Sequence, residues 1–312
     1  MAEKGKQGGK RRRTKKNNKK KDHTRTALVS LSCLLAFLLV AVILLYNKCP
    51  VKDKVYPPAK PSGVSPETLP PEPDIKKERS REVIPTDIKT RKTYKVAIVI
   101  DDLGYNNGRS DDLLNIDASL TFSIFPFCPY SQPIARKAHA MGRDVLLHLP
   151  MEPYNYPEKN PGNGSLFLDM SDEEILSRLD ADLSSVPFIK GVNNHMGSRF
   201  TENKEKMRVV LRELKERNLF FLDSRTSRNS VGYSMAREIG LKTATRNIFL
   251  DNDQDIASIN AQIDKLVRQS IKKGSAIGIG HPYPSTIEAL KQTIPELGAK
   301  GIEVVPISQL VN

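Results

Sequence analysis

Carboxylate and imidazole side chains follow several short apolar runs of this chain, each at the point where the run ends. The run TYKVAIVI is followed by Asp101 and Asp102, and later runs end at His148, His195 and His281. One carboxylate and two or three imidazoles form a donor set that suits Zn²⁺ or a similar divalent ion with an open water position. Strand alternation would point Asp101 and Asp102 to opposite sides, so one can bind a metal while the other works as a base.

Further polar residues lie at the same kind of position: Glu152 after the third run, Arg199 after the fourth, Asp223 and Arg225 after the fifth, and Tyr283 after the seventh. Each pattern taken alone has an ordinary structural reading. An Asp-Asp pair can cap a helix, a lone His can be hydrogen-bonded structure, and Asp223 with Arg225 can form a loop salt bridge. Their joint placement at the ends of the runs is what predicts a functional metal site.

The apolar runs are too short for helices and rich in β-branched residues, which is typical of strands buried on both faces. They span residues 93–100, 119–125, 144–149, 188–192, 219–222, 243–250, 276–279 and 303–307. Amphipathic stretches lie between them at 202–216, 258–273 and 286–300, and Ser171 with Glu174 forms a capping-box pattern that opens another helix. About seven β-then-α units predict a parallel sheet, closed or nearly closed into a barrel, with catalytic residues at the carboxyl ends of its strands.

The formal charge of +13 is concentrated at the N-terminus. Residues 1–26 hold about twelve Lys and Arg residues against Glu3 and Asp22. Residues 27–46 then run without a charge, and about twenty such residues span the roughly 30 Å hydrocarbon core of a membrane. A cleaved signal peptide would have a shorter apolar region and a small-residue cleavage site, so an uncleaved anchor is expected. The basic run predicts a cytoplasmic N-terminus and attraction to membrane lipid, and it is not interpreted as a nucleic-acid arm.

Residues 47–92 are rich in Pro, Lys and Glu and show no apolar periodicity, so they are expected to form an extended linker. The predicted organisation is a basic cytoplasmic tail at 1–26, a transmembrane helix at 27–46, this linker, and one α/β domain at 93–312. A tether of this kind would hold the domain on the far side of the cytoplasmic membrane. Partner proteins are not indicated by any pattern in the sequence.

The motifs VAIVIDDLG, LLHLPMEP, NNHMGSRFT, FFLDSRT and IGHPYPSTIEAL together resemble the NodB-type polysaccharide deacetylases, and more closely their divergent second family of bacterial envelope proteins. The resemblance covers residues 96–312. It implies a NodB-like distorted (β/α) barrel and a bound divalent metal, with Zn²⁺ as the expected ion. It also implies a protein of the bacterial inner membrane whose catalytic domain faces the periplasm or the cell exterior.

Carried over by that resemblance, Asp101 matches the general base and Asp102 the metal-binding carboxylate. His148 matches the first His of a His-x-x-x-His metal motif. The second His position of that motif holds Glu152 here, which departs from the family's pattern. His195 is therefore expected to supply the missing imidazole, with Glu152 bound to the metal or close to it.

His281 matches the general acid by the same resemblance, and Asp223 matches a residue that orients the acid or the base. The Arg-Pro-Tyr loop of the family is absent, and the segment NHMGSRF stands in its place. Arg199, Arg225 and Tyr283 are the expected substrate-binding residues. The implied reaction is metal-assisted hydrolysis of an acetamide on an N-acetylated envelope polysaccharide or peptidoglycan.

Two other functions remain open from the sequence. One is a non-catalytic glycan-binding or cell-envelope scaffold protein that retains the barrel, and the substitution at Glu152 favours it. The other is a different metallohydrolase, an esterase or a phosphoesterase, in which Arg199 and Arg225 hold a phosphate.

Overall fold

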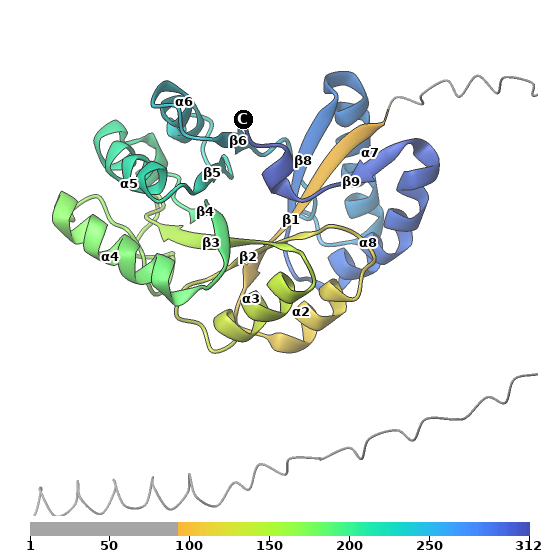
Figure 1. The fold of residues 1–312 in the computed structure, drawn as a ribbon, viewed down its shortest axis with the longest axis horizontal. Helices are drawn as coiled ribbons and strands as arrows, with labels where there is room; N and C mark the ends of the chain where they lie inside the picture. The colour runs from red at the N-terminus through yellow and green to blue at the C-terminus, as the bar shows by residue number, and fades with distance from the viewer. Residues whose placement is uncertain (1–92) are drawn as a thin grey trace, which may run out of the picture. The chain divides into compact units, whose positions relative to one another are not determined.

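The computed structural model describes residues 93–312, which form one parallel sheet wrapped by helices (Figure 1). The expected basic tail, membrane helix and linker at 1–92 lie outside the described residues. Within residues 93–312, no helix combines the length and the apolarity that crossing a membrane requires.

The strands follow the predicted apolar runs closely. They are β1 (Tyr94–Leu103), β2 (Thr121–Ile124), β3 (Asp144–Met151), β4 (Ile189–Met196), β5 (Phe220–Asp223), β6 (Thr243–Thr245), β7 (Ile248–Phe249), β8 (Ser275–Gly280) and β9 (Ile302–Val304). The run at 243–250 divides into two strands, because β6 pairs with β5 whereas β7 pairs with β8. Between them, the side chain of Asn247 accepts the backbone N–H of Ile277 at 2.7 Å.

The helices follow the strands in alternation. They are α2 (Asn107–Leu114), α3 (Ser131–Ala140), α4 (Asp172–Ser185), α5 (Lys204–Glu216), α6 (Gly232–Glu238), α7 (Ile256–Lys273) and α8 (Pro284–Leu297), with short 3₁₀ turns at Phe200–Glu202, Gly298–Lys300 and Ile307–Gln309. The predicted capping box opens α4: Ser171 accepts the N–H of Glu174, whose side chain accepts the N–H of Ser171. Such a cap stabilises a helix by about 1 kcal/mol.

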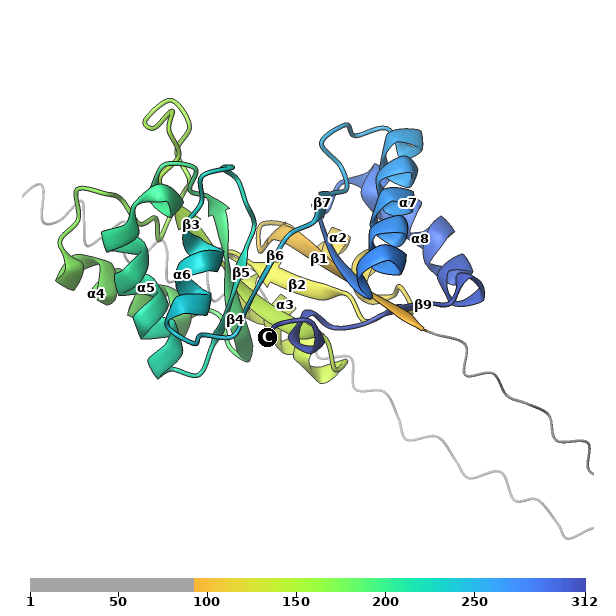
Figure 2. The same ribbon diagram turned by 90° about the horizontal axis from the view of Figure 1, so that it is seen from above.

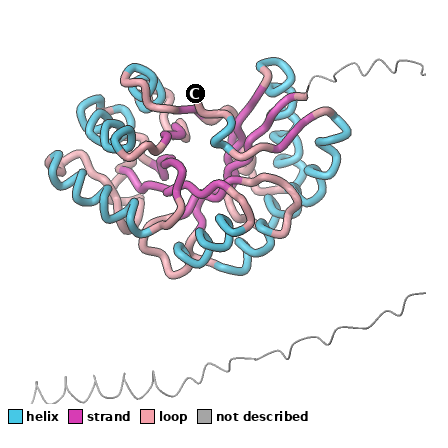
Figure 3. The backbone as a smooth tube through the Cα atoms, in the orientation of Figure 1, coloured by secondary structure: helices cyan, strands magenta, loops and turns pink. Residues whose placement is uncertain are grey.

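The sheet is an open half-barrel. Its strand order is β6-β5-β4-β3-β2-β1-β8-β7, with β9 added beside β1, and all pairs are parallel. The outermost strands β6 and β7 do not pair with each other, so the barrel is less closed than predicted. Figure 3 shows the strands lining the inside and the helices outside. Figure 2 shows α4, α5 and α6 on one flank and α7 and α8 on the other.

Apolar side chains fill both faces of the sheet. On the inner face, the last residues of the chain complete the filling at the amino ends of the strands. Ile307 is fully buried there, and its N–H bonds to the hydroxyl of Thr121 at 3.1 Å. Asn312 exchanges two backbone hydrogen bonds with Thr243, beside β6 (Figure 1). These residues thereby cover the amino end of the half-barrel. The polar side chains of the candidate site lie at the opposite end, where the strands have their carboxyl ends.

Candidate metal centre

Asp101 and Asp102 lie in β1 at the point where its regular pairing with β2 is interrupted. Its register with β2 shifts between Ile100 and Leu103, and Asp102 there has a φ of 57°, in the left-handed region that Asp tolerates better than most residues. This conformation cancels the strand alternation. Asp101 Oδ2 and Asp102 Oδ1 therefore both face His148 Nε2, at 3.8 Å and 3.0 Å. The prediction that the two carboxylates point to opposite sides is wrong.

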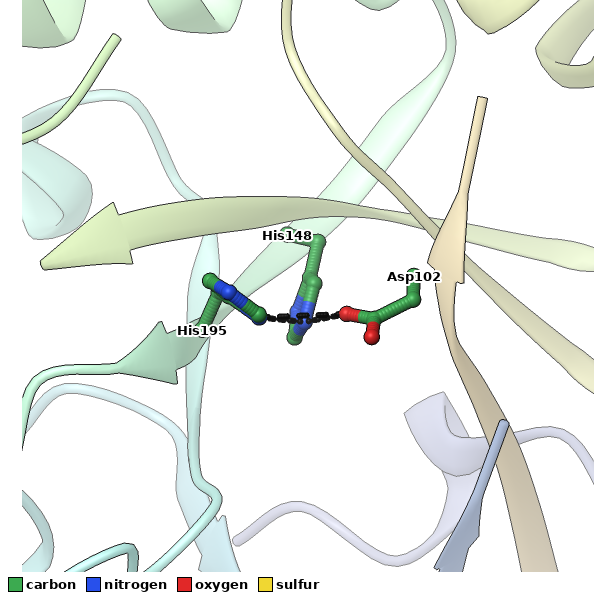
Figure 4. Close-up of side chains that lie close together, drawn as sticks. All are labelled: Asp102, His148 and His195. Atoms are coloured by element: carbon green, nitrogen blue, oxygen red, sulfur yellow. Dashed lines mark hydrogen bonds and ion pairs between the residues drawn. The ribbon is translucent and has the colours of Figure 1, made fainter. Parts of the chain in front are cut away.

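Three potential ligand atoms, from β1, β3 and β4, converge at this point (Figure 4). Asp102 Oδ1 lies 3.0 Å from His148 Nε2 and 3.1 Å from His195 Nδ1, and the two nitrogens are 3.1 Å apart. A divalent metal about 2.0–2.1 Å from each atom would set its ligands roughly 2.9–3.4 Å apart, and the three separations fall within that range. The structure thus brings together the three residues that were predicted to bind the metal directly.

The surroundings of the imidazoles suit metal binding as well. His148 Nδ1 lies 3.0 Å from the side-chain oxygen of Asn193, a partner of the kind that leaves Nε2 as the metal-facing atom. The ring of Phe125 packs edge-on against His148 and His195, with centroid distances of 5.0 Å and 4.7 Å. The donor set of one carboxylate and two imidazoles therefore fits Zn²⁺ or a similar divalent ion, with positions left for water or substrate.

The charge distribution of this cluster favours a cation. Burial alone would raise the pKa of Asp102, but hydrogen bonds and charges from His148 and His195 outweigh it and hold that pKa far below its usual range. Burial also opposes the charged imidazoles. In His148 the nearby carboxylates outweigh burial and raise the pKa, whereas in His195 burial prevails and lowers the pKa. The carboxylate therefore stays ionised beside an imidazole with a reduced affinity for protons.

A second polar cluster lies beside the first, at the end of β8. The register of β1 and β8 pairs Ile100 with Gly280, so His281 follows at the level of Asp101. His281 Nδ1 lies 2.9 Å from Asp251 Oδ1, and the buried Asp251 follows β7. Burial opposes the charge of His281, but its hydrogen bond and ion pair with Asp251 outweigh this and raise its pKa to about 9. An imidazole that is protonated at neutral pH is therefore positioned next to the carboxylates.

Two predicted site residues, Asp223 and Glu152, lie outside these two clusters. Asp223 accepts hydrogen bonds from the N–H of Arg225 at 2.8 Å, from the hydroxyl of Ser230 at 2.7 Å and from the N–H of Tyr233 at 3.0 Å. Within the described residues these are its side-chain partners, so it orders the loop before α6 and contacts neither candidate acid nor candidate base. Asp251 occupies the orienting position that was expected of Asp223.

Glu152 is buried, but it does not reach the three converging ligand atoms. Its carboxylate accepts a hydrogen bond from Arg199 Nη1 at 2.6 Å and from the N–H of Leu168 at 2.7 Å. These bonds fasten the loop between β3 and α4 to the end of β4. The structure therefore assigns Arg199 an ion-pair partner within the chain, although about half of its side chain stays exposed.

Tyr283 and Arg225 are the remaining expected substrate residues. The ring of Tyr283 lies 5.5 Å from that of His281, centroid to centroid. Arg225 follows β5, where its carbonyl accepts a hydrogen bond from Arg246 Nη2 at 3.0 Å. Sequence reasoning placed neither Asn193 nor Asp251 among the site residues, although each directly follows a predicted apolar run, 188–192 or 243–250. A polar side chain directly after an apolar run was the signal that would have found them.

Comparison with known proteins gives consistent matches over the described domain. Residues 98–311 match a family model described as divergent polysaccharide deacetylase. YibQ, an uncharacterized protein of Escherichia coli K12, is 37% identical over 220 residues, which are 70% of this chain and 67% of that protein. An uncharacterized protein of Haemophilus influenzae is 36% identical over 216 residues, 69% of this chain and 76% of that one. The crystal structure of an uncharacterized protein of Agrobacterium tumefaciens C58 matches with a TM-score of 0.68 at 29% identity, covering 70% of this chain and 90% of that one.

Proposed function

The chain belongs to the divergent polysaccharide deacetylase family, as its motifs predicted, and from that membership we propose that it is a metal-dependent hydrolase that removes acetyl groups from an N-acetylated glycan. The observation that carries the proposal is the convergence of Asp102, His148 and His195 to about 3 Å of one another. Asp101 borders this cluster. His281 follows β8, which pairs with β1, and its partner Asp251 follows β7 on the far side of β8.

The reaction divides between a metal and the side chains around it. Asp102, His148 and His195 would hold a divalent ion, which would supply Lewis-acid polarisation of an acyl carbonyl and a water of lowered pKa. Asp101, buried beside them, accepts the proton of the attacking water. His281, whose pKa is raised to about 9, donates a proton to the leaving amine. The products of this hydrolysis are acetate and a free amino sugar.

The position of Glu152 supports a catalytic role over a purely structural one. The substitution at Glu152 was the feature that supported a non-catalytic barrel. Its carboxylate is occupied by Arg199, and the ligand set is completed by His195 from the next strand. The cluster thus offers three candidate protein ligands without Glu152, the number usual in catalytic zinc sites.

The sequence supports a location and a substrate for this activity. We propose that residues 27–46 anchor the chain in the bacterial inner membrane, with the N-terminus in the cytoplasm and the domain facing the periplasm or the cell exterior. A domain on the linker at 47–92 would meet peptidoglycan or another envelope polysaccharide. Its partners in this proposal are that glycan and the membrane lipid.

Acetate release tests the proposal directly. The purified full-length protein, loaded with Zn²⁺, is incubated with peptidoglycan and other N-acetylated glycans, and free acetate is measured. We expect release that a chelator abolishes and that Asp101→Asn removes while metal content stays unchanged. Stoichiometric metal without acetate from any envelope glycan would refute deacetylation. Chelator-sensitive cleavage of a chromogenic ester or phosphoester instead would indicate the other metallohydrolase class.

A further inference from the structure

Asn193 lies directly beneath the metal centre, in β4, and is fully buried. Its carboxamide has two donor and two acceptor positions, and the structure provides a partner for each. The Nδ2 group donates to Asp101 Oδ1 at 2.9 Å and to Ser224 Oγ at 3.2 Å. The Oδ1 atom accepts from Ser123 Oγ at 2.5 Å and faces His148 Nδ1 at 3.0 Å. No other side chain of the described domain bonds to both Asp101 and His148.

The partners of this amide fix its orientation. In the ionised state that a base requires, Asp101 only accepts hydrogen bonds, so Asn193 must turn Nδ2 towards it. The reversed amide would place two acceptor oxygens about 2.9 Å apart, with no proton between them. Oδ1 then necessarily faces His148.

The fixed amide in turn selects the tautomer of the imidazole. An acceptor at His148 Nδ1 requires the proton on that nitrogen, and a neutral imidazole carries only one. When a metal replaces the proton at Nε2, that nitrogen offers its lone pair at the point where it converges with Asp102 and His195. Metal-binding histidines are oriented by just such a partner on the second ring nitrogen.

We infer that Asn193 is a positioning residue that couples the metal centre to the base. Its carbonyl holds His148 in the metal-binding tautomer and ring orientation. Its amide group holds one oxygen of Asp101 and leaves the other, Oδ2, facing the site. The role towards Asp101 rests on the proposed deacetylase function, whereas the role towards His148 requires only that the site binds a metal.

Two substitutions in the full-length chain separate these roles. Asn193→Ala removes both and is expected to weaken Zn²⁺ binding about 10- to 100-fold in competition with a chelating dye. Asn193→Asp keeps an acceptor for His148, so Zn²⁺ is expected to bind at least as tightly as in the wild type. Its second oxygen repels Asp101, so acetate release should fall about 10- to 100-fold. Ser224→Ala, which removes the other acceptor of the same amide group, is the matched control and should leave both measurements close to wild type.

A spectroscopic measurement reports the contact itself. In the Zn²⁺-loaded protein, the Nδ1 proton of His148 should give a downfield, slowly exchanging resonance, which Asn193→Ala abolishes and Asn193→Asp retains. Wild-type Zn²⁺ affinity and an unchanged resonance in a folded Asn193→Ala protein would overturn the inference. If the alanine variant does not fold, loss of the resonance in Asn193→Asp would overturn it equally. Wild-type protein that binds Zn²⁺ but releases no acetate would instead refute the proposed function and leave the affinity result standing.

Discussion

His281 Nδ1 lies 2.9 Å from Asp251 Oδ1, and Asp251 Oδ2 accepts the backbone N–H of the same histidine at 2.6 Å. The hydroxyl of Thr286, in the first turn of α8, donates to that second oxygen at 2.8 Å. One buried carboxylate thus positions both the backbone and the ring of His281. It also supplies the negative charge that keeps the imidazole protonated at neutral pH.

Asp251→Asn is expected to lower the pKa of His281 from about 9 towards its ordinary value of 6.5. A general acid acts in its protonated form, so the alkaline limb of the activity profile should move to lower pH by about two units. Acetate release measured across pH, with an NMR titration of His281, tests this. Thr286→Val is the control: it removes a neutral hydrogen bond and leaves the charge of Asp251, so the limb should move much less. An alkaline limb that Asp251→Asn leaves in place would show that another group is the acid.

Substitution of either imidazole in the cluster is expected to remove the metal. His148→Ala and His195→Ala each leave two ligands, which lowers metal content measured by elemental analysis of the purified protein. Glu152→Gln is the matched control, because that side chain bonds to Arg199 and Leu168 and lies outside the cluster. It should retain the wild-type metal content. Full metal content in both histidine variants would contradict the site.

The sequence predicted the strands and the end of the sheet at which the site lies. Continuous β-branched runs such as that of β1 have one stable placement, buried on both faces, and parallel strands bring all their carboxyl ends to one edge. Asp101, Asp102, His148, His195 and His281 were chosen on this basis, and the structure places them at that edge. Their individual roles as base, ligand or acid remain predictions.

Two features depended on information that periodicity does not carry. The left-handed conformation of Asp102 arises from a register shift between β1 and β2, and a local pattern gives no sign of such pairing. Asp223 and Asp251 both follow strands, so the sequence treats them alike. Only the strand order sets β7 beside β8, and with it Asp251 beside His281, while β5 lies on the other half of the sheet.

Asp182 provides a prediction for the dependence of stability on pH. It is fully buried in α4, and neither carboxylate oxygen has a hydrogen-bond partner among the described residues. Burial raises its pKa from 3.8 to about 8, although the charge of Arg178 opposes this. The folded state thus favours the protonated acid. Its contribution to stability is complete below about pH 3.8 and is lost as the pH rises through about 8.

Asp182→Asn is therefore expected to raise the free energy of unfolding at pH 8 and to flatten its decline between about pH 4 and pH 8. Urea unfolding at several pH values measures this. Asp180→Asn is the control on the same helix, because Asp180 is exposed and pairs with Arg217, so its effect should stay within about 0.5 kcal/mol. Equal pH slopes for wild type and Asp182→Asn would mean that the buried carboxyl is not protonated.

Gly164 lies against Asp182 in the loop between β3 and α4, and its replacement by Ala tests how tightly that loop is packed. A Cβ at this position would overlap the carboxylate of Asp182 and lie 2.9 Å from Cγ of Pro126. The φ of +82° adds strain, since a left-handed conformation costs a residue with a side chain about 1–2 kcal/mol. Gly142→Ala has a similar φ of +71° but no atom within 4 Å of the added carbon, so it carries the backbone strain alone. We expect Gly164→Ala to destabilise the domain by about 1–3 kcal/mol more than Gly142→Ala in urea unfolding, and equal losses would show that the loop relaxes away from α4.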